Sequence, residues 1–296
     1  MKKRTGYLRL MRPANIVTAI ADVLAGIAIS GFMAAWVFDY LHTLPVLLLC
    51  ISTAGLYGGG VVFNDVFDAG LDRVERPERP IPSGLISLKK ATTLGSLLLL
   101  LGITAAFAVN LTSGLFAVLI TISALAYNKW GKHHVFIGPI NMGLCRGLNL
   151  LLGVSILPGV IISWWYIALV PIIYISAITM VSRGEVHGSS RVTLYGASLL
   201  YALVISLIFY FAFINDNVLI VLAFLLPFAW MIFKPLIKAV KEPSGFNIGK
   251  AVKAGIIALI LMDAAWAAAS GAFVAAMMIV LLLPLSFWLA RLFAVT

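Results

Sequence analysis

Four residues that can bind a divalent cation stand close together in one short stretch. They are Asn64, Asp65, Asp68 and Asp72. The aspartates are spaced i, i+3 and i+7, so a continuing helix would present all three carboxylates on one face. Three such carboxylates repel one another unless a cation binds between them. Oxygen ligands suit Mg²⁺, which commonly bridges to phosphate oxygens, so the spacing predicts a metal-bound phosphate or diphosphate.

Basic residues follow the aspartates directly, at Arg73, Arg76 and Arg79. Guanidinium groups bind phosphate oxygens bidentately, so this segment can surround one diphosphate with both a cation and arginines. The plain alternative is a solvated helix end in which the arginines only balance the aspartates. Polar clusters at the rim of a membrane span are usually functional, which favours the ligand-binding interpretation.

The elements that position this cluster must cross a membrane. Hydrophobic residues make up 62% of the 296-residue chain and charged residues only 11%, against about 25% in an ordinary soluble domain. The apolar runs are apolar on every face, which predicts helices and excludes barrel strands. The net charge of +10 is spread over short loops and forms no continuous face, so no nucleic-acid partner is expected. We therefore expect an all-α, multi-pass membrane bundle.

Hydropathy and loop signals predict ten spans. They cover residues 14–36, 44–66, 91–109, 111–127, 136–156, 164–182, 193–213, 217–237, 249–269 and 272–292. The turn at 269–271 is very short, so the last pair could be partitioned differently and the total is nine or ten. Every lysine and arginine except Arg146 falls on one side of this arrangement. The positive-inside rule then places the N-terminus and the aspartate loop in the cytoplasm, and the chain, as a single domain over 1–296, in the inner membrane.

The aspartate stretch also has a recognisable pattern. Asn64-Asp65-x-x-Asp68-x-x-x-Asp72-Arg73, followed by Arg79-Pro80-Ile81-Pro82-Ser83-Gly84, resembles the first aspartate-rich motif and following loop of the UbiA superfamily of intramembrane prenyltransferases. Leu10-Met11-Arg12-Pro13-x-Asn15 is similar to the N-terminal entry of that family. Ala126-Tyr127-Asn128 with Lys132 resembles the loop after its fourth span.

The resemblance implies a helical bundle, typically of nine spans, around a central cavity that opens sideways to lipid. It implies transfer of an isoprenyl chain from its diphosphate to a lipophilic or aromatic acceptor, with Mg²⁺ as the cofactor. Asn64, Asp65, Asp68 and Asp72 would then hold Mg²⁺ on the diphosphate. Lys132 and Arg146 would neutralise the leaving group, and Asp68 and Lys132 would count among the catalytic residues.

The second acidic motif of the family is altered in this chain. Its place near 181–191 is taken by Ser182-Arg183-Gly184-Glu185-Val186-His187-Gly188-Ser189-Ser190-Arg191. Glu185 could hold a second Mg²⁺ and act in catalysis, whereas imidazole is a poor ligand for so hard a cation, which makes His187 an interfacial residue. Either one metal suffices, or Arg183 and Arg191 hold part of the diphosphate, or the activity has changed. The run is similar to the EboC branch of UbiA-like proteins.

Three further polar residues lie within spans. Asp22 and Asp263 either face the cavity or each make one interhelical hydrogen bond. Arg146, about midway along a span, needs an anionic partner or a wet cavity.

Two other functional classes compete with the prenyltransferase. A non-catalytic carrier or lipid-binding relative would keep the first motif and lose the second metal site. An alcohol phosphotransferase also uses aspartates at a helix end, but its Asp-Gly-x-x-Ala-Arg opening is absent from this sequence.

Overall fold

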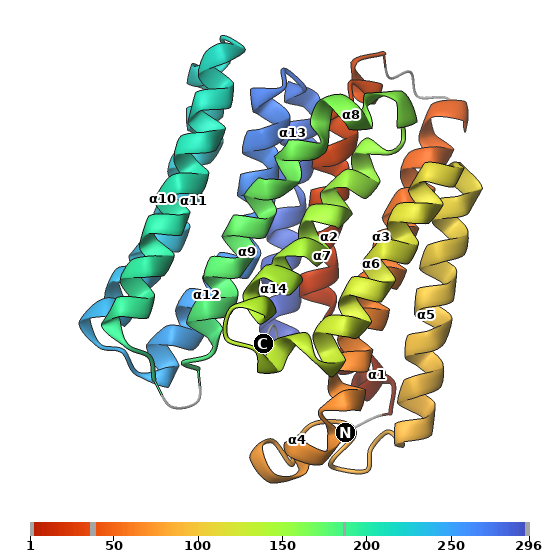
Figure 1. Ribbon diagram of the computed structural model, residues 1–296, viewed down its shortest axis with the longest axis vertical. Helices are drawn as coiled ribbons and strands as arrows, with labels where there is room; N and C mark the ends of the chain where they lie inside the picture. The colour runs from red at the N-terminus through yellow and green to blue at the C-terminus, as the bar shows by residue number, and fades with distance from the viewer. Residues whose placement is uncertain (1–2, 36–39, 186–187, 294–296) are drawn as a thin grey trace.

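The computed structural model describes residues 3–35, 40–185 and 188–293, and every regular element in that part of the chain is helical (Figure 1). The α-helices are α1 Lys3–Met11, α2 Pro13–Ile29, α3 Tyr40–Phe67, α4 Ala69–Glu75, α5 Leu88–Val109, α6 Leu111–Lys129, α7 Ile137–Val154, α8 Ile161–Trp164, α9 Leu169–Ser182, α10 Arg191–Ile214, α11 Val218–Lys241, α12 Gly245–Ala269, α13 Phe273–Val280 and α14 Leu282–Leu292. Short 3₁₀ turns are η1 Phe32–Ala35, η2 Gly131–His133, η3 Pro158–Val160 and η4 Trp165–Ala168.

The span count depends on one bent pair of helices. Nine helical segments of the described chain are long and apolar enough to cross a membrane, and α1 with α2 makes a tenth if the pair, bent by 42°, is one span. The bend lies at Arg12, whose φ of 46° is left-handed, directly before Pro13. Proline disfavours the α conformation in the residue before it, which explains the break. The expected fold class is confirmed, with the first span ending at Ile29, earlier than predicted.

Helix α12 lies inside the bundle and α5 lies at its edge. Figure 1 shows α5 on one side of the bundle and the α10–α11 pair on the opposite side, with α2, α7, α9 and α12 between them. Residues of α12 are buried on all sides along most of its length, as expected for a helix that is apolar all round. Helix α5 buries only its glycine and alanine stripe, with Leu99, against α3. Its leucine face is left for lipid.

Glycines bring α2 and α7 into direct backbone contact. A Cβ on Gly26 would lie 2.1 Å from the carbonyl oxygen of Leu150, and one on Gly153 would lie 2.2 Å from that of Val23. Small residues allow this close approach, which supplies packing contacts between membrane helices. The same crossing holds the polar side chains of α7 against those of α2.

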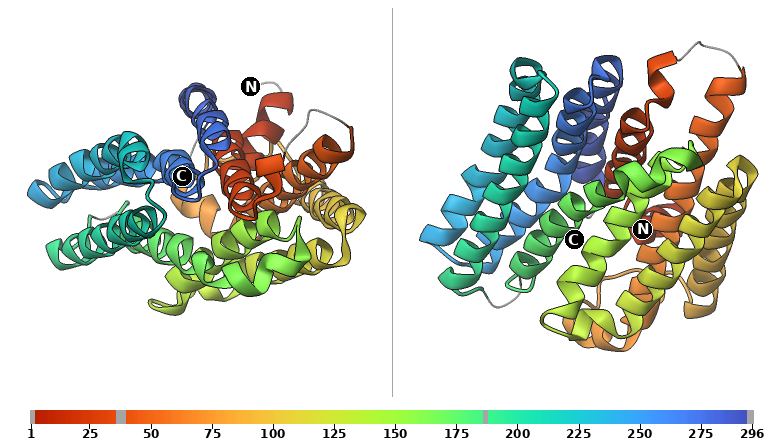
Figure 2. Two further views of the ribbon diagram at one scale, coloured as in Figure 1. Left: turned by 90° about the horizontal axis from the view of Figure 1, so that it is seen from above. Right: turned by 45° about the horizontal axis from the view of Figure 1, so that its top comes forward.

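The aspartate-bearing end of the bundle is built from helix ends. Helices α3, α6 and α9 finish there and α7 begins there, so the loops that follow or precede them meet at one end. The views from above and from the raised top show these helices arranged around a common centre (Figure 2). Residues far apart in sequence therefore come together at that centre.

Candidate functional site

A cavity of about 400 Å³ lies among α3, α6, α7, α9 and α12, and we call it the main cavity. Its polar end lies where these helices finish or begin, and apolar side chains line the rest. The charged lining residues at the polar end are Arg12, Asp68, Asp72, Glu75, Arg76, Arg79, Lys132 and Glu185. The apolar lining includes Leu56, Ile120, Ile175, Ile178 and Ile256. Such a cavity can hold a charged head group at one end and a hydrocarbon chain at the other.

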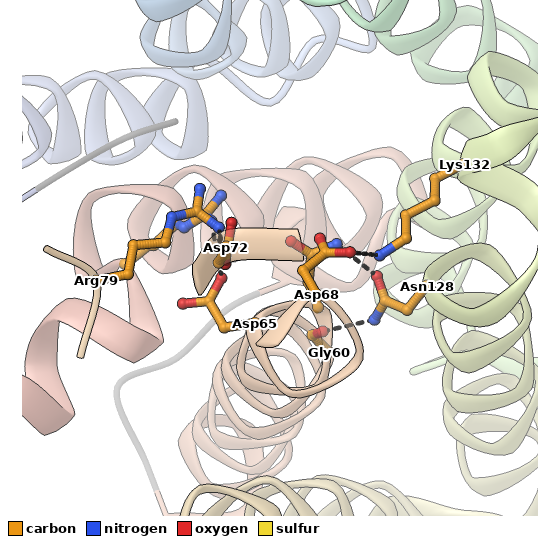
Figure 3. A network of polar contacts seen from close by, with 9 residues as sticks. Gly60, Asp65, Asp68, Asp72, Arg79, Asn128 and Lys132 are labelled. Atoms are coloured by element: carbon orange, nitrogen blue, oxygen red, sulfur yellow. Dashed lines mark hydrogen bonds and ion pairs between the residues drawn. The ribbon is translucent and has the colours of Figure 1, made fainter. Parts of the chain in front are cut away.

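The three aspartates are divided between two sets of cations (Figure 3). Arg79 binds both Asp65 and Asp72, with its Nη1 at 3.4 Å from Asp65 Oδ1 and 2.8 Å from Asp72 Oδ2. Asp68 instead forms an ion pair with Lys132. Asp65 and Asp72 thus meet at one arginine, whereas Asp68, the single residue between α3 and α4, pairs with Lys132, so the three carboxylates do not converge on one point.

Asp65 shares Arg79 with Asp72 but differs from the other two aspartates in its position relative to the main cavity. Its carboxylate is nearly buried and also accepts from Arg12 Nη2 at 3.2 Å. It does not line the main cavity, whereas Asp68 and Asp72 do. The arrangement indicates that Asp65 orients the two arginines that stand between it and the cavity.

Asn64 is oriented by Asn128, a residue of α6. Asn64 Nδ2 donates to Asn128 Oδ1 at 3.1 Å, and Asn128 Nδ2 donates to the carbonyl oxygen of Gly60 at 2.8 Å. Because its amide nitrogen donates to Asn128, the side-chain oxygen of Asn64 can accept from, or coordinate, a ligand in the cavity that Asn64 lines. Asn128 is part of the pattern quoted above, but only the fold brings it beside α3.

Glu185, from the altered second motif, enters the main cavity just after α9. Its Oε1 atom is buried and has no hydrogen-bond partner. Burial raises the pKa of this carboxyl above its ordinary value, and Arg76, Arg12 and Arg79 oppose the rise. A buried carboxylate oxygen without a partner is suited to a cation. His187 lies outside the described residues.

The donor set fits Mg²⁺ by its chemistry. Asn64, Asp68, Asp72 and Glu185 all present oxygen atoms and all line the main cavity. Within the described ranges no three His, Cys, Asp or Glu side chains converge closely enough to form a metal cluster. The carboxylates of Asp68 and Asp72 are neutralised by Lys132 and Arg79 instead. Metal binding would therefore exchange these ion pairs for cation contacts.

Arg146 has the anionic partner that its depth in the membrane demands. The side chain is 3% exposed, its Nη1 donates to Asp22 Oδ2 at 2.6 Å and its Nη2 donates to Thr18 Oγ1 at 2.7 Å. The guanidinium also lies over the ring of Tyr57, 4.7 Å from its centroid. Arg146 and Tyr57 line the apolar part of the main cavity. Asp22 is thus explained by an interhelical contact, the second of the two expectations for it, and Asp263 is fully buried on α12.

The predicted arginines separate into two groups. Arg76 and Arg79 line the main cavity together with Lys132. Arg73 is exposed on α4, and Arg183 is exposed and donates from its Nη2 to the carbonyl oxygen of His134 at 2.6 Å. Neither lines the cavity, so we do not retain Arg73 and Arg183 among the proposed diphosphate ligands.

Comparison with known proteins identifies the family. The model of the UbiA prenyltransferase family matches residues 23–245 of this chain. The chain belongs to the UbiA prenyltransferase family. The resemblance that starts at Asn64 is thereby confirmed, and the alcohol phosphotransferase alternative is set aside. Membership in the EboC branch stays a prediction.

Three relatives illustrate the likeness. Digeranylgeranylglyceryl phosphate synthase of Methanosphaera stadtmanae is 34% identical over 147 residues, which are 50% of this chain and 51% of that protein. The chain thus matches about half the length of such curated relatives. The apo UbiA homologue of Aeropyrum pernix K1 superposes with a TM-score of 0.69 at 15% identity, covering 84% of this chain and 96% of that one. The Archaeoglobus fulgidus UbiA homologue bound to GPP and Mg²⁺ gives a TM-score of 0.62 at 18% identity, covering 84% and 99%.

Proposed function

We propose that this protein transfers a prenyl group from an isoprenyl diphosphate to an acceptor in the membrane, with Mg²⁺ at the polar end of the main cavity. The observation that carries the proposal is the cavity itself, in which oxygen ligands and cations at one end meet an apolar interior. Family membership supports it, as does the homologue from Archaeoglobus fulgidus that was solved with GPP and Mg²⁺.

The proposed ligands of Mg²⁺ are Asn64, Asp68, Asp72 and Glu185. A bound cation would neutralise the diphosphate oxygens and make the diphosphate a better leaving group. Asp65 is assigned an orienting role through Arg12 and Arg79.

The chain's own residues would act on the diphosphate and on water. Lys132 and Arg79 line the polar end and would donate to the phosphate oxygens, stabilising the charge that develops there. The bond between prenyl C1 and the diphosphate oxygen breaks, and the electron pair leaves with the diphosphate. The acceptor's nucleophilic atom then bonds to C1, and its proton passes to the released diphosphate. The apolar walls exclude water from the reacting carbon.

The acceptor that we propose is a lipid with a glyceryl phosphate group and a free hydroxyl. The support is the name of the curated relatives, which are digeranylgeranylglyceryl phosphate synthases. An aromatic acceptor is the alternative, and it would lack the phosphate.

We further propose that residues 1–296 form a single domain in the inner membrane with the aspartate-bearing end in the cytoplasm. Helices α12 and α14 pack against α2, so the C-terminal helices, which lie beyond the matched family region, belong to the same bundle. The lysines and arginines of the loops gather at the aspartate-bearing end, as the positive-inside rule requires of a cytoplasmic face.

A carrier that binds the diphosphate without turnover is the second candidate. Two observations favour the carrier: Asp68 is paired with Lys132, and the altered motif has a single described carboxylate. Both reduce the negative charge that is available to bind a metal ion. The two candidates differ in turnover and agree in binding.

Asp68→Asn tests the proposed function, because it removes one charge and keeps the size of the side chain. Mg²⁺-dependent binding of geranyl diphosphate to the purified protein should fall at least tenfold, and transfer should fall with it. Asp216→Asn, an exposed change in the turn between α10 and α11 at the other end of the bundle, is the matched control and should change neither.

Glu185→Gln, measured in the same binding and transfer assays as Asp68→Asn, distinguishes the enzyme function from the carrier function. If Glu185 holds the Mg²⁺ that would stabilise the departing diphosphate, turnover should drop by about 10² to 10³, with a smaller loss of binding. Unchanged binding in Asp68→Asn would contradict the assigned site. Binding without transfer in the wild type, across all acceptors, would replace the enzyme with the carrier.

A further inference from the structure

A second cavity, of about 630 Å³, adjoins the main cavity at the aspartate-bearing end, and we call it the arginine pocket. It lies between α1, the segment after α4, the segment after α9, the start of α12 and the end of α14. Its lining residues are Arg9, Arg12, Asp65, Arg76, Glu78, Arg79, Pro80, Glu185, Gly245, Gly249 and Leu292. The functional assignments made so far place no ligand in this space.

Two arginines of the pocket have no counter-charge in contact with them. Arg12 and Arg79 bind Asp65, but neither Arg9 nor Arg76 forms an ion pair within the described residues. Of the remaining carboxylates, Glu78 is exposed and Glu185 is one of the proposed metal ligands. Two guanidinium groups that line one pocket and form no ion pair are suited to bind an anion with several oxygen atoms, such as a phosphate.

The pocket is placed to hold one end of a molecule that reacts in the main cavity. Arg12, Arg76, Arg79 and Glu185 line both spaces, so one layer of side chains separates them. In a glyceryl phosphate, the phosphate and the free hydroxyl are only a few bonds apart. A phosphate in the arginine pocket therefore leaves the hydroxyl near the polar end of the main cavity, where the diphosphate is proposed to bind.

We propose that the arginine pocket binds the phosphate of the acceptor, with Arg9 and Arg76 as its ligands, and so selects phosphorylated over neutral acceptors. This inference rests on the proposed acceptor class. It separates the two phosphate-bearing substrates, with the donor's diphosphate at Lys132 and Asp68 and the acceptor's phosphate on the other side of Arg79.

Gly249 allows the pocket to be filled without touching the main cavity. It lines only the arginine pocket, and a Cβ added there meets no atom within 4 Å. Leucine is a better helix former than glycine, so Gly249→Leu should fold. Gly159→Leu is the matched control, because a Cβ at Gly159 also meets open space, and Gly159 lies in η3 at the opposite end of the bundle. Arg9→Gln removes one proposed ligand from the same pocket.

The assay measures transfer from geranylgeranyl diphosphate to two acceptors, geranylgeranylglyceryl phosphate and geranylgeranylglycerol, which lacks the phosphate. The wild type and Gly159→Leu should show a KM at least about tenfold lower for the phosphorylated acceptor, as expected from charge-assisted hydrogen bonds. In Gly249→Leu this preference should shrink to less than about twofold, with the KM for the donor unchanged, and Arg9→Gln should lie between them.

Several results would overturn the inference. An unchanged acceptor preference in Gly249→Leu would do so, and a raised KM for the donor alone would assign the pocket to the diphosphate instead. If the wild type binds the donor but prenylates neither acceptor, the proposed reaction fails, and direct titration with geranylgeranylglyceryl phosphate still decides the pocket. Binding that Gly249→Leu abolishes supports it, and no binding to the wild type overturns it. Equal affinity for inorganic phosphate alone would show a free-phosphate site.

Discussion

Replacing Arg146 with methionine should destabilise the protein by about 3 to 5 kcal/mol, because it leaves a buried aspartate without its cation. Asp22 is fully buried and takes hydrogen bonds from Arg146 at 2.6 Å and from Asn149 at 3.1 Å. At an effective dielectric constant of about 20, two unit charges at this separation attract by about 6 kcal/mol, much of which offsets desolvation. Methionine keeps an unbranched, adaptable side chain, so the change removes charge more than volume.

Thermal unfolding of the purified protein in detergent measures the effect. At about 2 °C per kcal/mol for a chain of this size, Arg146→Met should lower Tm by about 6 to 10 °C. The double variant Asp22→Asn/Arg146→Met is the decisive comparison, because it removes both charges. It should be more stable than the sum of the two single changes predicts, by at least about 1.5 kcal/mol. Strict additivity, or a shift below about 2 °C in Arg146→Met, would refute the buried ion pair as a determinant of stability.

Two further outcomes are expected. Gly153→Ala should lower the free energy of unfolding by more than about 2 kcal/mol in the same assay, because its Cβ would lie 2.2 Å from the carbonyl oxygen of Val23. Gly159→Ala, which has open space at its Cβ, should change Tm little. Equal shifts in the two variants would contradict the α2–α7 contact. Reporter fusions after Arg291 and within residues 73–90 should report the same cytoplasmic side, and an external report after Arg291 would favour nine spans over ten.

The length and apolarity of the runs were sufficient to predict the helical bundle. Lipid leaves the backbone no partner other than its own helix, so hydropathy alone decides the class of structure. The same reasoning placed the last two spans on either side of the turn at 269–271, where α12 ends and α13 begins. It could not predict the early end of the first span at Ile29, because nothing in a hydropathy profile reports a helix end.

The sequence by itself also determined which residues could meet a diphosphate, through the spacing of Asn64, Asp68 and Asp72 and the basic residues after them. Only the tertiary structure decided how they are used. Asp68, the residue between α3 and α4, pairs with Lys132, whereas Asp65 and Asp72 share Arg79 and Asp65 also binds Arg12. Two of these pairings, Arg12 with Asp65 and Lys132 with Asp68, join residues more than 50 positions apart. Spacing along one helix carries no information on such contacts, because they arise only when separate helices pack.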